Sequence, residues 1–568
     1  MPLTICRLRR LLAALALALP LLGQAHPDSS ADKLQGKLPA QELTGQILYQ
    51  VLLAEIAANR GSLQIAASAY GELARSTRDP RVARRATEIS IYARQPEPAL
   101  EMARLWVSLD PASPQARQTL IGLLLAAKRI DEVAPQLSQL LSQDSGRLTE
   151  ILPQLNHILA RYPDKLAVAR VIEQVTQMYE DTLETHLARA QAYLAAGDDG
   201  RALAAAERAI VLRPDSEQAV LLKAEILRKT SPAQALDVLR GHVQAYPQAR
   251  EVRLAYARVL VLERQFEPAR REYQALLQAN KGDYDAAYAV ALLSLQVNDL
   301  ATAEREFKSL LDIGFSDVNV VRLYLGQIAE ESKKTEEALH WYALVTPGEQ
   351  YLPAQARAAN LLAREGQLEE GRALLRRAAA ASPKEDVSFL VAEAQLLTDA
   401  GRIAAAFDLL SDRLAAQPEE PQLLYESALL AEKLGRHEVL ETNMRLLIRL
   451  KPEHAHAYNA LGYSLAERNL RLDEAQQLIE KALSLAPNDA FILDSKGWVL
   501  YRRGDNGAAL DFLQKAYRQR PDPEIAAHLG EVLWVLGRHD EAEKTWNAAR
   551  SADPRNEVLA ATIRKFQH

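Results

Sequence analysis

The histidines and the single cysteine carry the most distinctive chemistry of this chain, and their spacing does not assemble a reactive site. His454 and His456 are two residues apart, so on a strand both could ligate one metal ion, but no further His or Cys lies near them. Two histidines do not complete the four ligands of a zinc site. The chain also lacks a Gly-x-Ser-x-Gly motif, a phosphate-binding Gly-rich loop and a His-Glu-x-x-His motif. We therefore expect no catalytic residue, no metal and no cofactor.

A set of aromatic and polar side chains near the C-terminus has the composition of a peptide-binding surface. The set comprises Asn459, Tyr463, Asp494, Trp498, Tyr501, Glu531 and Trp534. Aromatic rings supply contact area at low entropy cost, and polar groups fix the register of a bound segment. We expect these residues to lie exposed on the inner, concave surface of a helical array and to hold a partner protein. The alternative is that Trp498 and Trp534 pack between successive helices.

The elements that would position these residues follow from a small residue that returns every 33 to 35 positions. Twelve members of the series are alanine and one is glycine: Ala66, Ala99, Ala134, Val168, Ala202, Ala235, Ala269, Ala303, Ala338, Gly371, Ala406, Leu440, Ala475, Ala509 and Ala542. A fixed period of this length predicts stacked repeats. Such arrays present long curved surfaces, which favours a partner-binding protein over an enzyme.

Each repeat is predicted to contain two helices that a tight turn separates. In the last two complete repeats the break falls at Gly504-Asp505 and at Gly537-Arg538. Prolines, which disfavour helix in the preceding residue, close the C-terminal repeats at Pro383, Pro418, Pro452, Pro487, Pro521 and Pro554. This is the tetratricopeptide pattern, and most of the chain resembles that superfamily. The resemblance implies an all-α solenoid, a right-handed superhelix of about fifteen helix-turn-helix repeats.

The N-terminus predicts export. Three arginines, Arg7, Arg9 and Arg10, precede an apolar run over 11–22 and a small-residue cleavage site. This pattern is typical of a signal peptide, here 1–25; an uncleaved amphipathic start is the alternative. Cleavage would remove Cys6, the only cysteine, and His26 stands where a lipoprotein would carry a cysteine. We expect a soluble periplasmic protein, associated with the outer membrane at most through its partners.

The rest of the chain divides into two parts. Residues 26–41 are polar and contain Pro and Gly, so we expect a flexible linker. Residues 42–568 form the predicted superhelix, with a first helix near 43–59, a degenerate repeat around 145–181, an irregular turn at 346–353 and a capping helix at about 555–566. Without the leader the net charge changes from −6 to −9. The acidic balance argues against nucleic acid as a partner, and no integral membrane segment is expected.

Two stretches resemble a narrower group of proteins. One is LLAEIAANRGSLQIAASAYGELARSTRDPRVARRATEISIYAR near the N-terminus; the other comprises ILDSKGWVLYRRGDNGAAL and EIAAHLGEVLWVLGRHDEAEKTW near the C-terminus. Both are similar to exported tetratricopeptide proteins of proteobacteria, which include the lipoprotein adaptor of a carboxyl-terminal processing protease. The resemblance implies a scaffold that activates a periplasmic serine protease and brings in substrates such as peptidoglycan hydrolases. That adaptor is anchored by lipid, whereas this chain has no cysteine at the cleavage site. The sequence therefore does not decide whether the chain is tethered to a membrane.

The sequence therefore predicts a non-enzymatic periplasmic adaptor, whose partners are proteins. One alternative is a scaffold for an envelope assembly machine, such as polysaccharide export or pilus biogenesis. A second is an enzyme of cell-wall or glycan metabolism, which convergent acids with strongly perturbed pKa values would favour.

Overall fold

The computed structural model describes Pro39, residues 41–143, Leu152, Leu155, Leu159 and residues 161–566. The predicted signal peptide, nearly all of the linker and most of the first half of the degenerate repeat lie outside these residues. Thirty α-helices and a few short 3₁₀ turns account for the ordered elements, and the described residues form no strand. The chain divides into two compact units between Val297 and Asn298.

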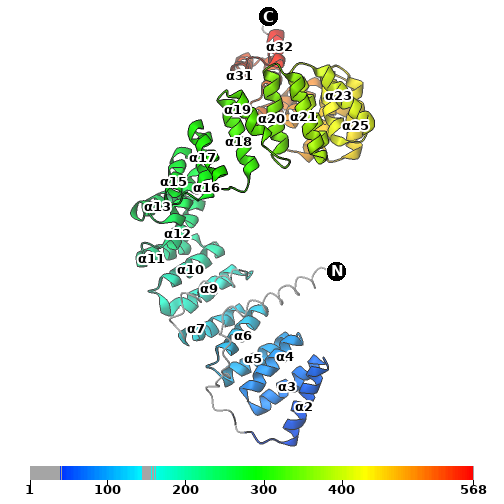
Figure 1. The fold of residues 1–568 in the computed structure, drawn as a ribbon. Helices are drawn as coiled ribbons and strands as arrows, with labels where there is room; N and C mark the ends of the chain where they lie inside the picture. The colour runs from blue at the N-terminus through cyan, green and yellow to red at the C-terminus, as the bar shows by residue number, and fades with distance from the viewer. Residues whose placement is uncertain are drawn as a thin grey trace. The chain divides into compact units, whose positions relative to one another are not determined.

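The first unit contains fourteen described helices (Figure 1). They are α2 (Gly45–Asn59), α3 (Leu63–Thr77), α4 (Pro80–Tyr92), α5 (Pro96–Leu109), α6 (Pro114–Ala126), α7 (Val133–Gln143), α9 (Lys165–Thr176), α10 (Leu183–Ala196), α11 (Asp199–Leu212), α12 (Glu217–Thr230), α13 (Pro232–Ala245), α14 (Arg250–Leu262), α15 (Phe266–Ala279) and α16 (Tyr284–Gln296). The predicted first helix is confirmed as α2.

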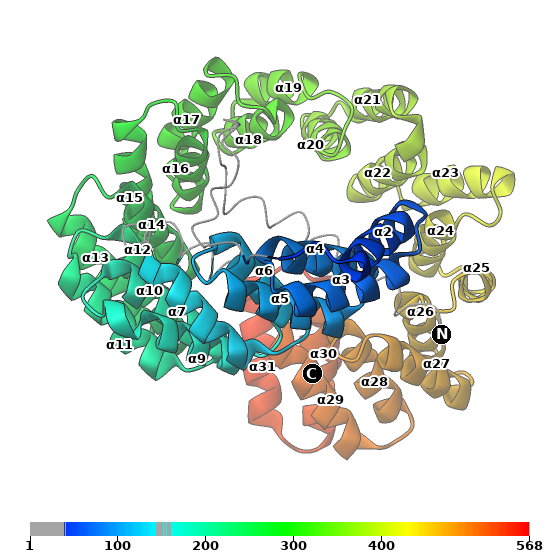
Figure 2. The same ribbon diagram turned by 90° about the horizontal axis from the view of Figure 1, so that it is seen from below.

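The second unit carries the predicted binding residues. Its helices are α17 (Leu300–Asp312), α18 (Val318–Glu331), α19 (Thr335–Ala343), α20 (Tyr351–Arg364), α21 (Leu368–Ala381), α22 (Asp386–Asp399), α23 (Ile403–Ala416), α24 (Pro421–Lys433), α25 (His437–Leu450), α26 (Ala455–Glu467), α27 (Leu472–Leu485), α28 (Ala490–Arg502), α29 (Asn506–Gln519), α30 (Pro523–Val535), α31 (His539–Ala552) and α32 (Glu557–Phe566). From α20 to α30 the first helix of each repeat lies on the inner side of an arc and the second helix on the outer side (Figure 2).

Local sequence explains where the helices begin and end. Asp489 caps α28 by accepting hydrogen bonds from the N–H groups of Phe491 and Ile492, at 2.9 and 3.1 Å. The turns within the last repeats pass through Gly504 and Gly537 at φ +88° and +78°, a left-handed conformation that glycine adopts without strain. All six predicted proline stops are confirmed, because α21, α23, α25, α27, α29 and α31 each end two residues before their proline.

The small residues of the repeat are confirmed as the contact between paired helices. Thirteen of the fifteen members lie on the second helix of a described pair, and the alanines of the series are at most 3% exposed. On the first helix, a Cβ added to Gly497 would lie 2.5 Å from Leu513 Cγ, and one added to Gly530 would overlap the indole of Trp546. Paired helices therefore pack so closely that these positions have no room for a methyl group.

Two irregular features differ in detail from expectation. The interruption expected at 346–353 occupies 344–350, because α19 is only nine residues long and α20 begins at Tyr351. Pro353 consequently lies in the first turn of α20, where its missing N–H leaves no bond unmade. In the degenerate region, α9 is a normal helix, and a 3₁₀ turn at Gln177–Tyr179 follows it.

The C-terminal helix occupies the place of a cap. α32 packs against α30 and buries Leu559 and Ile563, while Arg564 and Lys565 stay exposed. A solenoid needs a terminal element with a polar outer face, and α32 has one.

The glycines of the first helices generate a prediction about stability. We expect Gly530→Ala to lower the free energy of unfolding of the second unit by about 1–3 kcal/mol, because the methyl group must displace the Trp546 ring. Gly507→Ala is the matched control, since only Asp505 Oδ1, at 4.0 Å, would approach the added Cβ. That change should be neutral or stabilising by up to about 1 kcal/mol, as alanine favours helix. Urea unfolding followed by circular dichroism measures both; equal midpoints for the two variants would contradict the close-packing account.

Candidate functional site

The seven residues that the sequence singled out lie on the first helices of three consecutive repeats. Asn459 and Tyr463 are on α26, the next three on α28, and Glu531 and Trp534 on α30. α28 packs against both α26 and α30. The structure joins five of the seven, namely Tyr463, Asp494, Trp498, Tyr501 and Glu531, into one network with Glu467, His528 and Lys565. We call these eight residues the inner-face network.

His528 is the centre of this network, and it is 7% exposed. Its Nδ1 lies 2.9 Å from Asp494 Oδ2, and its Nε2 lies 3.3 Å from the hydroxyl of Tyr463. The ring stacks on that of Trp498, with centroids 4.1 Å apart. Three first helices therefore meet at one imidazole, and α30 is bonded directly to α26, two repeats earlier.

Three further hydrogen bonds complete the network, and the ring of Tyr501 joins it 5.2 Å from that of Trp498. The indole N–H of Trp498 donates to Glu467 Oε2 at 2.7 Å. The hydroxyl of Tyr501 donates to Glu531 Oε1 at 3.1 Å, and Lys565 Nζ donates to the same oxygen at 2.9 Å. Lys565 belongs to α32, so the cap is tied to the inner face. Each polar group buried here has a partner, as burial requires.

The charges of the network shift the pKa values of its members. Burial alone would lower the pKa of His528, but Asp494, with smaller contributions from Glu467 and Glu531, raises it, so the net shift is upward. Burial, together with Glu531, raises the pKa of Tyr501 to about 12. Burial raises the pKa of Tyr463 still further, with Glu467 and Asp494 adding to it. The upward shift favours the charged form of His528, and both tyrosines keep their hydroxyl protons.

Three of the seven residues that we expected to lie exposed on the inner surface are buried, so the expectation is wrong for them. Asp494, Trp498 and Glu531 are only 6%, 4% and 6% exposed. α28 packs against both α26 and α30, and His528 of α30 reaches Tyr463 of α26, so the side chains of neighbouring repeats cover one another. Whether these residues bind a partner stays a prediction, and any partner would first meet the residues around them.

Trp534 and Asn459 lie outside the network. Trp534 stacks on His539 at 4.2 Å and lies 5.7 and 6.2 Å from the rings of Trp546 and Phe566, so it helps to hold the cap. Asn459 is half-buried, and within the described part of the chain its Oδ1 accepts no hydrogen bond.

Two accessible residues border the network and form what we call the rim. Phe491 is 41% exposed at the start of α28, and Glu524 is exposed at the start of α30, 33 positions later. Although the residue is exposed, partial burial of its carboxyl group raises the pKa of Glu524, and Asp522 adds to the shift. The Glu524 carboxylate has no hydrogen-bond partner among the described residues, so the rim offers an accessible aromatic ring at the start of α28 and an unpaired acid at the start of α30.

Sequence reasoning missed His528. The signal was present in the repeat length, because His528 follows Asp494 by 34 positions, which is one repeat. It follows Tyr463 by 65 positions, slightly less than two repeats. The imidazole has no free nitrogen as folded, since Asp494 and Tyr463 engage both. His454, which the sequence analysis considered as a metal ligand, caps α26 by accepting a hydrogen bond from the N–H of Ala457 at 3.1 Å.

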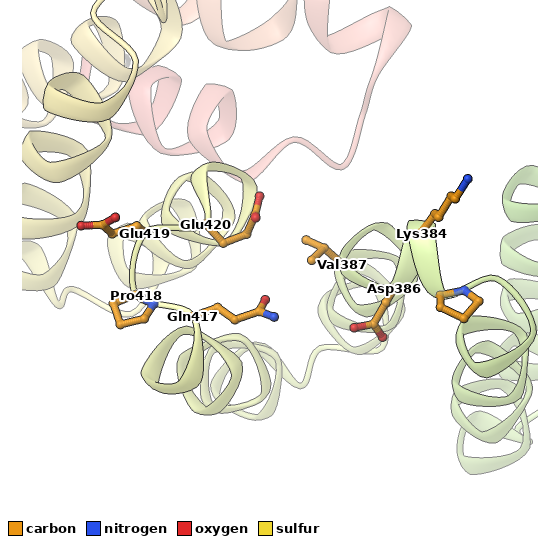
Figure 3. Close-up of a pocket in the computed structure, with 8 residues that line it drawn as sticks. Lys384, Asp386, Val387, Gln417, Pro418, Glu419 and Glu420 are labelled. Carbon is orange, nitrogen blue, oxygen red and sulfur yellow. The ribbon is translucent and has the colours of Figure 1, made fainter.

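A separate pocket of about 530 Å³ lies between the turns that follow α21 and α23, lined by Pro383, Lys384, Asp386, Val387, Gln417, Pro418, Glu419 and Glu420. Val387 and Gln417 point toward each other across it, whereas Lys384 and Glu419 point away (Figure 3). The lining therefore brings no charged groups to a common point. Among the residues described, no three His, Cys, Asp or Glu side chains gather as metal ligands. No described helix has the length and apolar character to cross a membrane.

The Asp494–His528 pair generates a prediction about pH. Because the folded-state pKa of His528 lies above the ordinary 6.5, the stability that its charge contributes is complete below pH 6.5. That contribution is lost as the pH rises through the higher folded-state value. We expect the urea midpoint of the second unit to fall across this window, and His528→Gln to remove the fall. His340→Gln, on α19, should retain it. Asp494→Asn should cost about 3–5 kcal/mol at pH 6, because it breaks a buried ion pair; an unchanged midpoint would contradict the pairing.

Comparisons with known proteins agree with this architecture. Tetratricopeptide repeat family models match residues 187–250, 455–489 and 495–557. The TPR repeat-containing protein PA4667 of Pseudomonas aeruginosa is 32% identical over 527 residues, which are 91% of this chain and 88% of that protein. The TPR repeat-containing protein MJ1428 of Methanocaldococcus jannaschii is 31% identical over 84 residues, 15% of each chain.

Among solved structures, the thermophilic TPR protein TTC0263 of Thermus thermophilus is 25% identical and covers 31% of this chain and 97% of its own, with a TM-score of 0.29. The family assignment rests on two sequence comparisons, the long match to the Pseudomonas protein and the matches to the repeat models. Tetratricopeptide arrays are in general scaffolds for protein interaction and carry no catalytic machinery of their own. This chain belongs to the tetratricopeptide-repeat proteins.

Proposed function

We propose that the chain is an exported, non-enzymatic adaptor of the periplasm. In this proposal it binds a carboxyl-terminal processing protease and brings peptidoglycan hydrolases to it for regulated proteolysis. The role of a protein-interaction scaffold comes with the repeat family. The address, the protease and its substrates are the parts that we propose.

The rim is the observation that supports binding at the C-terminal repeats. Phe491 offers an accessible ring, and Arg520 lies 4.8 Å from its centroid. At the start of the next first helix, Glu524 has a carboxylate whose pKa is raised by burial and which lacks a hydrogen-bond partner among the described residues. A donor from a bound segment would stabilise the charged form of Glu524, and the segment would cover the ring. The inner-face network beneath the rim holds α26, α28 and α30 as a rigid support.

The resemblance of the two terminal stretches supports the protease as partner. Residues 52–94 and 492–546 contain the stretches similar to exported adaptors of processing proteases. The second stretch begins at Ile492, directly after Phe491, and contains Glu524, so the resemblance overlaps the rim in part. A signal peptide over 1–25 would deliver the chain to the compartment in which such a protease works.

A capture experiment tests this proposal. The chain from His26 onward is immobilised, incubated with envelope extract, and the retained proteins are identified by mass spectrometry. We expect a carboxyl-terminal processing protease, and we expect the purified protease to cleave a peptidoglycan hydrolase faster when the chain is added. Phe491→Ala with Glu524→Gln should lower the retained protease about 10-fold or more, as loss of a central aromatic contact and a charged hydrogen bond does.

The matched control is Leu470→Ala with Glu438→Gln, which removes an exposed apolar side chain and an exposed carboxylate outside the rim. This control should retain the protease as the unmodified chain does. Recovery of polysaccharide-export or pilus components in place of the protease would refute the protease assignment and favour an assembly scaffold. Equal loss in both double variants would refute the rim as the binding surface.

A further inference from the structure

The exposed large apolar side chains of the described chain are most concentrated on and beside α2. On this helix Tyr49 is 65% exposed, Leu52 51% and Ile56 50%, with Leu48 and Leu53 beside them. Ile65, at the start of α3, is exposed as well. Contiguous apolar surface of this kind marks a place where something binds.

The exposed residues of α2 form a stripe. Tyr49, Leu52 and Ile56 follow one another at intervals of three and four residues, which is the period of a coiled-coil seam. The opposite side of the helix is also apolar, because Ala54 and Ala57 are buried toward the rest of the unit. α2 thus has one apolar side packed within its own unit and a second that no described residue covers.

The charge of this surface narrows the choice of occupant. Glu55 is the one charged residue of α2, and it is engaged within the unit: Tyr70 donates to its carboxylate, and Arg85 lies 3.9 Å away. Helices that lie on lipid carry Lys and Arg on a polar face, and α2 carries neither. A surface free of charge suits pairing with its own copy, since across a two-fold axis each residue near the axis meets itself and any charge would be opposed by a like charge.

The first and last helices that the structure describes contrast in the same direction. α32 turns Arg564 and Lys565 to solvent over a buried Leu559 and Ile563, so it can end a solenoid in water. α2 turns Tyr49, Leu52 and Ile56 outward instead. Since a terminal repeat needs a polar outer face, α2 is suited to a place where its outer side is covered.

The area is sufficient for a specific contact. The exposed side chains of α2, together with Ile65, present roughly 600 Å² of apolar surface per copy. A symmetric pair would therefore bury about 1,200 Å², the lower bound of standard interfaces. We propose that two copies of this chain associate through α2, packed antiparallel about Leu52. In that arrangement Leu52 meets its own copy at the axis, and Tyr49 of one chain packs against Ile56 of the other.

Sedimentation equilibrium of the chain from His26 onward tests this inference. The unmodified chain should show a concentration-dependent dimer. Leu52→Arg and Leu52→Glu should each weaken the dimer about 100-fold or more, because like charges would meet at the axis. Mixing the two variants should restore it. Leu262→Arg, at a 67% exposed position on α14, is the control and should leave the dimer unchanged.

A cysteine variant gives a second readout that does not depend on adding a charge. The chain from His26 onward has no cysteine, so Leu52→Cys introduces a single thiol. Under mild oxidation it should form an interchain disulfide at micromolar concentration, whereas Leu262→Cys should not. A monomer at all concentrations, or a dimer that Leu52→Arg leaves intact, would overturn the proposal. Equal cross-linking of the two cysteine variants would overturn it as well.

Discussion

The close approach of the two helices within each repeat is the constraint on which the rest of the structure depends. Ala509 and Ala542 on the second helices are fully buried, and they lie opposite Gly497 and Gly530 on the first helices, where no Cβ fits. The close approach of the two helices sets the orientation of each pair and the angle at which the next pair stacks. Repeated many times, it determines which residues of distant repeats share a surface.

The inner-face network is a consequence of that regular stacking. Because Asp494 and His528 occupy neighbouring places one repeat apart, their side chains meet at 2.9 Å. Tyr463 reaches the same imidazole from two repeats away. Such a set of buried charges is costly unless every member is paired, and here the pairing crosses α26, α28, α30 and α32. The network therefore ties together repeats that otherwise contact only their neighbours, and it supports the rim at Phe491 and Glu524.

Much of this fold could be predicted from the sequence, because the repeat period and the residues that end the helices are local signals. The series of small residues located the second helix of each described pair, and six prolines located the ends of six helices. Exposure was harder to predict, since it depends on the small rotation between repeats, which accumulates over many residues and which no single repeat encodes. Trp498 is buried for that reason, because α30 closes against it.

Singular residues were the other difficulty. His528 has no counterpart in the neighbouring repeats, so periodicity did not mark it, although its offset of one repeat from Asp494 did place it. Trp534 was assigned to the binding surface, but it stacks beside Trp546 and Phe566 at the cap. Its true neighbours come from α32, which follows the last full repeat and breaks the pattern. The uncovered side of α2 was likewise invisible in the sequence, because an apolar helix at the start of an array has the composition of a buried one.

The central claim is that the inner side of the C-terminal repeats meets the partner protein. Hydrogen–deuterium exchange of the chain from His26 onward, with and without the purified processing protease, tests it most directly. The account predicts slower exchange on binding in α28 and α30, concentrated at their first turns, where Phe491 and Glu524 lie. Binding that protects other helices and leaves α28 and α30 unchanged would contradict it.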